Sequence, residues 1–183
     1  MTKTKQLTTC AMLIALATVL MLLSKILPSM PWGGSVTLAS MAPLIMISYL
    51  MGPKQGILSG IAYAVIQMLT GFYPPPTQTV PAFILVVLLD YLLAFGVLGL
   101  AGFFYRMFGK KRWAIPLSGA IVTSLRYLCH ILSGILIWGV YAEEGQTVLA
   151  YSLIYNGSYM IPEIIITTAV LALISGFVTS RTA

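Results

Sequence analysis

Four acidic, basic or imidazole side chains lie inside long apolar stretches of the sequence: Asp90, Arg126, His130 and Glu163. A charged group inside a membrane-spanning helix is costly, so each such residue is a candidate for function. For any one of them alone, the competing explanation is a buried ion pair or hydrogen-bonded network that holds helices together. We expect Arg126 in particular to pair with Glu163, with Asp90 or with backbone carbonyl groups.

The spacing around His130 favours a binding site. Arg126, His130, Gly134 and Trp138 recur at every fourth position. Each four-residue step turns a helix by about 400°, so successive members drift by only about 40° and form one stripe. A cation, an imidazole, a gap and a large aromatic ring on one face suit a flat ligand. A helix-packing face is the alternative, and it explains Gly134 better than it explains His130.

Other residue patterns that carry chemistry are absent from the sequence. It has no phosphate-binding GxxxxGK[ST] loop, no HExxH zinc motif and no GxSxG nucleophile motif. A single histidine in the whole chain argues against a transition-metal site. We therefore expect no catalytic residues, no metal and no cofactor, and we do not expect an enzyme.

The composition places these residues in a membrane protein. Soluble domains carry about 25% charged residues, whereas this chain carries 8% and is 59% hydrophobic, with a mean hydropathy of +0.97. Such a chain cannot cover itself with a water-soluble surface and needs a lipid bilayer as its solvent. The net charge of +6 fits the enrichment of Lys and Arg in cytoplasmic loops, so we expect no nucleic-acid partner.

The apolar runs predict an all-α membrane protein, a bundle of six transmembrane helices in a single domain that covers residues 1–183. A spanning helix needs roughly 20 apolar residues, and six spans with short loops use up the chain. The predicted spans cover approximately residues 7–27, 36–51, 55–72, 82–108, 113–141 and 148–178. The runs are continuous, which excludes the alternating pattern of barrel strands.

Two of these spans carry features that interrupt a regular helix. The second is short, which leaves open whether it is tilted or whether the segment before it re-enters the membrane. The sixth contains Pro162, which kinks the helix or delays its start from Val148 to Asn156. The N-terminal apolar run continues past Leu20 without a cleavage site, so we interpret it as the first span and not as a signal peptide.

The distribution of cations predicts the orientation. Eight of them share one side of the six-span layout: Lys3, Lys5, Lys54, Arg106, Lys110, Lys111, Arg112 and Arg181. The opposite loops contain Glu143 and Glu144 but no Lys or Arg, and only Lys25 lies near that side. Since cytoplasmic loops concentrate the cations, both termini are predicted to be cytoplasmic.

This orientation brings the candidate residues to a common depth. Asp90 lies about 10 to 12 Å from the outer end of its span and His130 about 13 to 16 Å from the outer end of the next, at 1.5 Å per residue. The following residues can therefore meet in one outward-facing pocket: Asp90, Tyr91, His130, Trp138, Tyr151 and Asn156. Aromatic rings around a carboxylate suit a flat organic cation.

Four segments carry a resemblance to a known family: PWGGSVTL, LLDYLLAFGVLGLAG, LRYLCHILSGILIWGVYAEEG and YSLIYNGSYM. In their order and in the six-span layout, the chain resembles the ThiT (YuaJ) family, the thiamine-binding S-components of energy-coupling factor (ECF) transporters. The resemblance covers essentially the whole chain. It implies a multi-pass protein of the bacterial cell membrane that binds thiamine (vitamin B1) with high affinity for uptake. It also implies association with an ECF module, made of one transmembrane T subunit and two ATPase subunits that hydrolyse the ATP.

The resemblance implies substrate-binding roles for eight residues: Trp32, Asp90, Tyr91, His130, Gly134, Trp138, Tyr151 and Asn156. His130 and Trp138 would flank the thiamine rings, with Gly134 leaving room for them. Asp90 would face the positive charge of the ligand, and Trp32 would form part of a lid. Tyr151, Asn156 and Tyr91 complete the implied set, and Tyr73 is matched more loosely.

The first span contains the segment Ala11-Met-Leu-Ile-Ala15. It resembles the AxxxA motif with which S-components dock on the shared transmembrane subunit. Small residues four positions apart allow close contact between helices. Ala11 and Ala15 are therefore the predicted docking residues.

Three other functions remain compatible with the residues. The nearest is an S-component for another flat vitamin of the pyridoxine type, although a neutral ligand would not need Asp90. A proton-coupled secondary transporter would use Asp90 and His130 as a relay and would need no ATPase partner. A small membrane enzyme would use the same pair as acid and base, but the chain lacks a nucleophile or metal motif.

Overall fold

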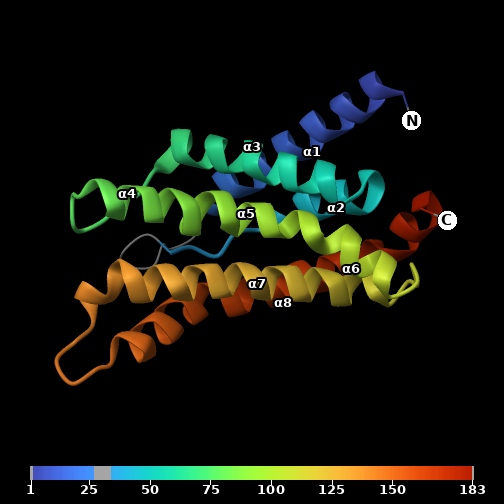
Figure 1. Ribbon diagram of the computed structural model, residues 1–183. Coiled ribbons are helices and arrows are strands. Elements are labelled where there is room, and N and C mark those ends of the chain that lie inside the picture. The colour runs from blue at the N-terminus through green and yellow to red at the C-terminus, as the bar shows by residue number, and fades with distance from the viewer. Residues whose placement is uncertain (1, 27–33, 183) are drawn as a thin grey trace.

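The computed structural model describes residues 2–26 and 34–182, and this part of the chain contains helices and loops but no strand (Figure 1). The helical elements are α1 (Lys3–Ser24), α2 (Met41–Met51), α3 (Pro53–Gly71), α4 (Val80–Val86), η2 (Val87–Leu93), α5 (Ala94–Gly96), η3 (Val97–Leu100), α6 (Ala101–Met107), α7 (Ala114–Leu136), η4 (Trp138–Tyr141) and α8 (Val148–Thr182). Elements α4 to α6 follow one another without a gap and form one irregular helix over Val80–Met107. The all-α class is thus confirmed.

Four helices in the described part of the chain are long and apolar enough to cross a membrane: α1, the irregular helix, α7 and α8. Helix α2 is shorter, with 11 residues. Helix α8 has 35 residues, which at 1.5 Å per residue corresponds to about 52 Å, well beyond a hydrocarbon core of about 30 Å. Helix α8 therefore continues past the apolar core of the bilayer.

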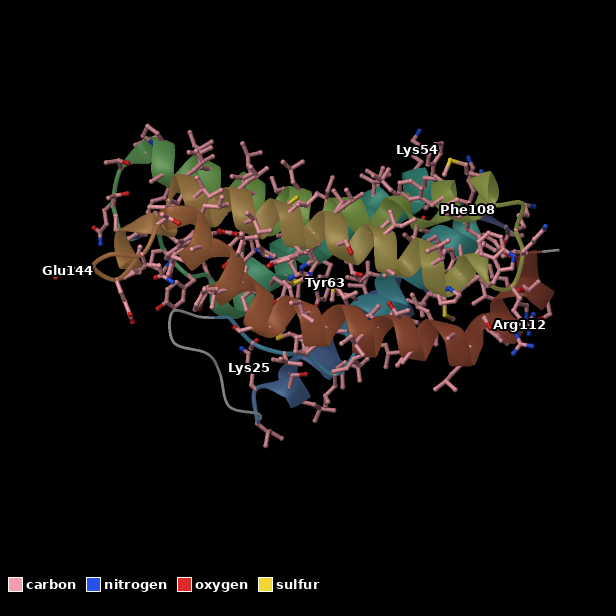
Figure 2. All side chains as sticks on the ribbon, turned by 90° about the horizontal axis from the view of Figure 1, so that it is seen from below. Lys25, Lys54, Tyr63, Phe108, Arg112 and Glu144 are labelled. Carbon is pink, nitrogen blue, oxygen red and sulfur yellow. The ribbon has the colours of Figure 1, made fainter. Side chains whose placement is uncertain are left out.

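The helices lie side by side in an elongated bundle (Figure 1). The first turn of α1 and the last turn of α8 lie at one end of the bundle, together with the loop between α6 and α7. The loops after α3 and before α8 lie at the opposite end. Figure 2 shows Lys54 and Arg112 at the first end and Glu144 at the other, with Lys25 on the Glu144 side of the middle. The charges are therefore segregated along the bundle.

The second predicted span, residues 36–51, is helical only from Met41 onward. Residues 34–40 are not helical. The backbone N–H of Thr37 donates to the carboxylate of Glu163 on α8, which places this segment inside the bundle. The helix of this predicted span is therefore preceded by a non-helical segment, and the choice between re-entry and tilt stays a prediction.

The irregular helix departs from α-helical geometry in two places. Element η2 is a π-helix that carries Asp90 and Tyr91, and η3 is a 3₁₀-helix. π-turns are rare and occur frequently at functional sites, because they reorient side chains that a regular helix would place elsewhere. The predicted extent of 82–108 is close to the observed one, but the change of pitch was not predicted.

Glycines let α3 and the irregular helix touch through their backbones. A side chain on Gly99 would overlap the backbone of Ile57, and one on Gly60 would overlap the carbonyl of Phe95. Close approach through small residues is the usual way in which helices pack inside membranes. The contact fixes the irregular helix against α3 and thereby fixes the orientation of η2.

The last two predicted spans are interrupted differently from expectation. Helix α7 ends at Leu136, and the remaining residues of the predicted span form η4, which begins at Trp138. Helix α8 begins at Val148 and continues through Pro162, so the proline does not delay its start. The backbone break after α7 means that Trp138 does not continue the helical stripe of Arg126 and His130 by regular geometry alone.

Ser48 of α2 forms hydrogen bonds with backbone groups of η3 and α6, where the irregular helix changes its pitch. Its hydroxyl donates to the carbonyl of Gly99 and accepts from the N–H of Gly102 at 2.8 Å. We expect Ser48→Ala to lower the free energy of unfolding by about 1 to 3 kcal/mol, because buried backbone groups lose their partner. Thermal melts in detergent measure this. Ser158→Ala is the control, since the exposed Ser158 hydroxyl bonds only within its own helix; an equal loss in both variants contradicts the role of Ser48.

Candidate functional site

A cavity of about 280 Å³ opens between the irregular helix, α3, α7, α8 and the segment 34–37. Its lining includes six of the residues singled out from the sequence: Asp90, Tyr91, His130, Trp138, Tyr151 and Asn156. A cavity of this size, lined by aromatic rings together with polar and charged side chains, suits a small organic molecule. The structure thus brings together residues from three helices that are up to 66 positions apart (156 − 90).

The carboxylate of Asp90 lies at the centre of the polar part of this cavity. Its Oδ2 accepts hydrogen bonds from Ser133 Oγ at 2.5 Å and from Trp138 Nε1 at 3.1 Å. Its Oδ1 lies 3.0 Å from His130 Nδ1. The π-helix of η2 presents the carboxylate, while α7 and η4 supply all three donors.

The hydrogen bonds also assign the state of His130. Arg126 Nε lies 3.3 Å from His130 Nε2 and donates to it. An arginine can only donate, so Nε2 is the acceptor and the ring hydrogen resides on Nδ1, where it is donated to Asp90. His130 is therefore a neutral imidazole that joins a guanidinium on one side to a carboxylate on the other.

Arg126 does not form the ion pair expected from the sequence. Among the described residues, the ion pair within 4.0 Å is that of His130 with Asp90. The imidazole of His130 lies between Arg126 and Asp90, because it is one helical turn nearer to the carboxylate on the same face of α7. The guanidinium instead lies 3.9 Å above the centre of the Phe95 ring, a cation–π contact.

Aromatic rings form two walls of the cavity. Trp138 stacks on Tyr141 with ring centroids 6.3 Å apart and planes at 17°, and Tyr73 lies 5.7 Å from Trp138. On α8, Tyr151 and Tyr155 stack with centroids 5.7 Å apart and planes at 15°. Flat faces on both sides offer stacking surfaces to a planar ligand.

The polar groups of the walls differ in how far the protein already satisfies them. Asn156 is buried and donates to the carbonyl of His130 at 3.2 Å, while it accepts from the hydroxyl of Tyr159 at 2.6 Å. The buried hydroxyl of Tyr151 has no hydrogen-bond partner among the described residues. Asn156 therefore ties α8 to α7, whereas the Tyr151 hydroxyl is left without a partner in the part of the chain that the structure describes.

The remaining predicted residues lie elsewhere. Gly134 faces α8, where an added side chain would overlap Ser152, and it is not part of the cavity lining. Trp32 lies outside the described residues. Ala11 and Ala15 are exposed on α1 and do not line the cavity. The position of Gly134 agrees with the packing alternative for that residue.

Sequence reasoning missed several residues of the site, and Ser133, which bonds to Asp90 from outside the cavity lining, is the most consequential. It donates the shortest bond to Asp90, and it stands three positions after His130, which places both on one face of a helix. A hydroxyl at that spacing was the available signal. Residues 34–37 carried no such signal, because their place in the cavity depends on a non-helical path.

Comparison with known proteins gives consistent results. The profile of the family described as Thiamine transporter protein (Thia_YuaJ) matches residues 7–181. The chain is 34% identical to the thiamine transporter ThiT of Bacillus subtilis over 176 residues, covering 90% of this chain and 86% of that protein. It is 31% identical to ThiT of Lacticaseibacillus paracasei over 96 residues, or 48% of each chain. The solved structure of ThiT from Listeria monocytogenes shares the fold, with a TM-score of 0.74, 21% identity and 98% of each chain covered.

The bond between Ser133 and Asp90 gives a stability prediction that needs no ligand. We expect Asp90→Ala and Ser133→Ala each to destabilise the protein, and the double variant to lose less than the sum, with a coupling of about 1.5 to 3 kcal/mol for a hydrogen bond to a charged group. Unfolding titrations in mixed detergent micelles measure the three free energies. The control cycle pairs Asp90→Ala with Ser152→Ala, whose hydroxyl bonds to the carbonyl of Ile131. Additive losses for Asp90 and Ser133 would rule out the bond.

Proposed function

The chain belongs to the thiamine transporter (Thia_YuaJ) family, and from this premise we propose that it captures thiamine in the outer half of the membrane as the S-component of an ECF transporter. The family and the long apolar helices make it a multi-pass protein of a bacterial cell membrane. Thiamine is the substrate in the names of the relatives. The steps that follow connect that substrate to the residues of this chain.

The observation that carries the proposal is the carboxylate of Asp90 inside an aromatic cavity. Thiamine is a flat molecule with two rings, one of which bears a fixed positive charge. The three protein groups that donate hydrogen bonds to Asp90 are neutral, so they hold the carboxylate in place without cancelling its charge. A cation above aromatic faces and beside a carboxylate is stabilised by both.

The walls supply the remaining contacts. We assign stacking on the ligand rings to Trp138 and His130, with Tyr91 beside the carboxylate. The free hydroxyl of Tyr151 and the side chain of Asn156 bind polar groups of the ligand. Trp32 lies outside the described residues, and its role in a lid stays a prediction. Gly134 supports the site by letting α7 and α8 approach closely.

We further propose six membrane crossings with both termini in the cytoplasm. In this arrangement α2 and the re-entrant segment before it share one crossing, and α3 forms another. The support is the segregation of charge, with Lys54 and Arg112 at the end of the bundle that holds the termini and Glu144 at the opposite end (Figure 2). Cytoplasmic loops concentrate cations, so the cavity opens to the outside.

Transport then requires a partner, because the cavity only binds. We propose that α1 docks on the T subunit of an ECF module whose two ATPase subunits provide the energy. Ala11 and Ala15 are both exposed near the middle of α1, and small side chains four positions apart allow a partner helix to approach closely. Neither of them lines the cavity.

The charge of Asp90 gives the test of the proposed substrate. We expect Asp90→Asn to weaken thiamine binding by about 2 to 5 kcal/mol, the cost of removing one partner of a buried charge pair. Binding of an uncharged thiophene analogue should change much less. Isothermal titration of both ligands measures the difference. Asp90→Glu is the control because it keeps the charge; equal losses for the charged and uncharged ligands in Asp90→Asn contradict the proposal.

Docking through α1 gives a separate test of transport. We expect Ala11→Trp combined with Ala15→Trp to abolish thiamine uptake in cells that hold a complete ECF module, while thiamine affinity of the purified protein stays unchanged. Bulky side chains block the close helix contact but do not reach the cavity. The control is Met12→Trp combined with Leu16→Trp, an equally spaced pair that is 68% and 47% exposed on α1.

Normal uptake by a well-expressed Ala11 and Ala15 variant would show that the partner docks elsewhere.

The contact between His130 and Asp90 is also what a proton-coupled carrier would use. Uptake in cells that lack the ATPase subunits, driven by a pH gradient, would favour that second function over an ECF-dependent one.

A further inference from the structure

The segment 34–40 is a non-helical stretch inside a membrane protein, and its backbone groups need partners there. Three side chains accept its N–H groups. Tyr155 accepts from Gly34 at 3.0 Å, Glu163 accepts from Thr37, and Ser24 accepts from Leu38 at 2.7 Å; the acceptors lie on α1 and α8. The segment is therefore held by side chains of two helices and not by a ladder of its own.

The segment matters because it forms one wall of the cavity. Gly34, Ser35 and Thr37 all belong to the cavity lining. Their positions depend on where the backbone of Thr37 is held, and that backbone is bonded to Glu163. A ligand in the cavity thus contacts a wall whose position depends on Glu163, a residue outside the cavity lining.

Glu163 itself does not line this cavity. It is 2% exposed and lies on α8 seven positions after Asn156, two helical turns deeper on the same face. It borders a second, small cavity of about 30 Å³ that also contacts Thr37, Ser40 and Arg126. The two cavities share Thr37 and Arg126 among their lining residues, so they are adjacent.

The surroundings explain why the acceptor is a carboxylate. Hydrogen bonds to an ionised acceptor are roughly twice as strong as those to a neutral one. The guanidinium of Arg126 borders the same small cavity and balances the charge of Glu163 across it. Glu163 Oε2 is buried and has no partner among the described residues, so the hydrogen bond that Glu163 makes in this part of the protein is the one to the segment.

We propose that Glu163 is a positioning residue for ligand capture: its carboxylate fixes Thr37 and thereby the wall formed by Gly34, Ser35 and Thr37. The inference rests on the proposed function for the identity of the ligand. When the bond is lost, the wall moves away from the ligand. The ligand then dissociates faster, while its entry into the cavity is unaffected.

The test combines two measurements on purified protein. Hydrogen exchange of residues 34–40 without ligand reports on the bond itself. Stopped-flow quenching of tryptophan fluorescence by thiamine gives the association and dissociation rates. We expect Glu163→Leu to accelerate exchange of this segment and to raise the dissociation rate about tenfold to a hundredfold, the change expected from losing a hydrogen bond to a charged group. The association rate should stay within about threefold.

Matched variants separate positioning from a loss of folding. Glu163→Gln keeps an acceptor oxygen without the charge and should give a dissociation rate between that of Glu163→Leu and that of the unmodified protein. Thr167→Val changes a buried hydroxyl one turn further along α8, which has no partner in the described part of the protein, and should alter neither rate. Ser24→Ala removes the bond to Leu38 by deleting one atom and should raise the dissociation rate as Glu163→Leu does, even where the Leu variant folds poorly.

Two outcomes overturn the inference. Unchanged exchange in Glu163→Leu shows that the bond is not what holds the segment. The second is faster exchange in both Glu163→Leu and Ser24→Ala while their dissociation rates equal that of the unmodified protein. That result shows that the position of the wall does not retain the ligand. A lack of thiamine binding by the unmodified protein refutes the proposed function instead, a result distinct from both.

Discussion

A carboxylate inside a membrane protein has to find its hydrogen-bond donors within the protein, because the surrounding lipid offers none. Asp90 finds three, and all of them come from α7 and η4. This requirement links the irregular helix to α7, sets the orientation of the Trp138 ring and assigns the hydrogen of His130 to Nδ1. The part of the bundle around the cavity is organised around that one carboxylate.

Irregular backbone is concentrated around the cavity. The π-helix η2, the 3₁₀-helix η4 and the segment 34–40 all contribute to its lining, whereas α1 and most of α8 are regular helix. Non-helical backbone at membrane depth is tolerated where it is buried in protein or lines a cavity. These three departures from regular helix therefore share one location, whereas the 3₁₀-helix η3 lies outside the cavity lining.

The helices could be predicted from the sequence because continuous apolar runs leave few alternatives in a membrane. The common lining by Asp90, His130 and Trp138 followed from depth and helical period. What could not be predicted depends on tertiary contacts: the break before Trp138, the π-turn at Asp90 and the path of residues 34–40. Arg126 illustrates the limit. A buried guanidinium requires a partner, but only the packing of the helices shows that the partners are the Phe95 ring and His130.

The dependence of Asp90 on three separate donors also bears on how ligand preference changes during evolution. Replacing the carboxylate by an apolar side chain would take the acceptor from His130 and Ser133 and leave Trp138 only its bond to Ser133, and each unsatisfied donor costs about 1 to 3 kcal/mol. A descendant that prefers a neutral vitamin would have to replace the carboxylate and its donors together. Preference for a charged ligand is thus protected against single substitutions, and a change of substrate class requires several coordinated ones.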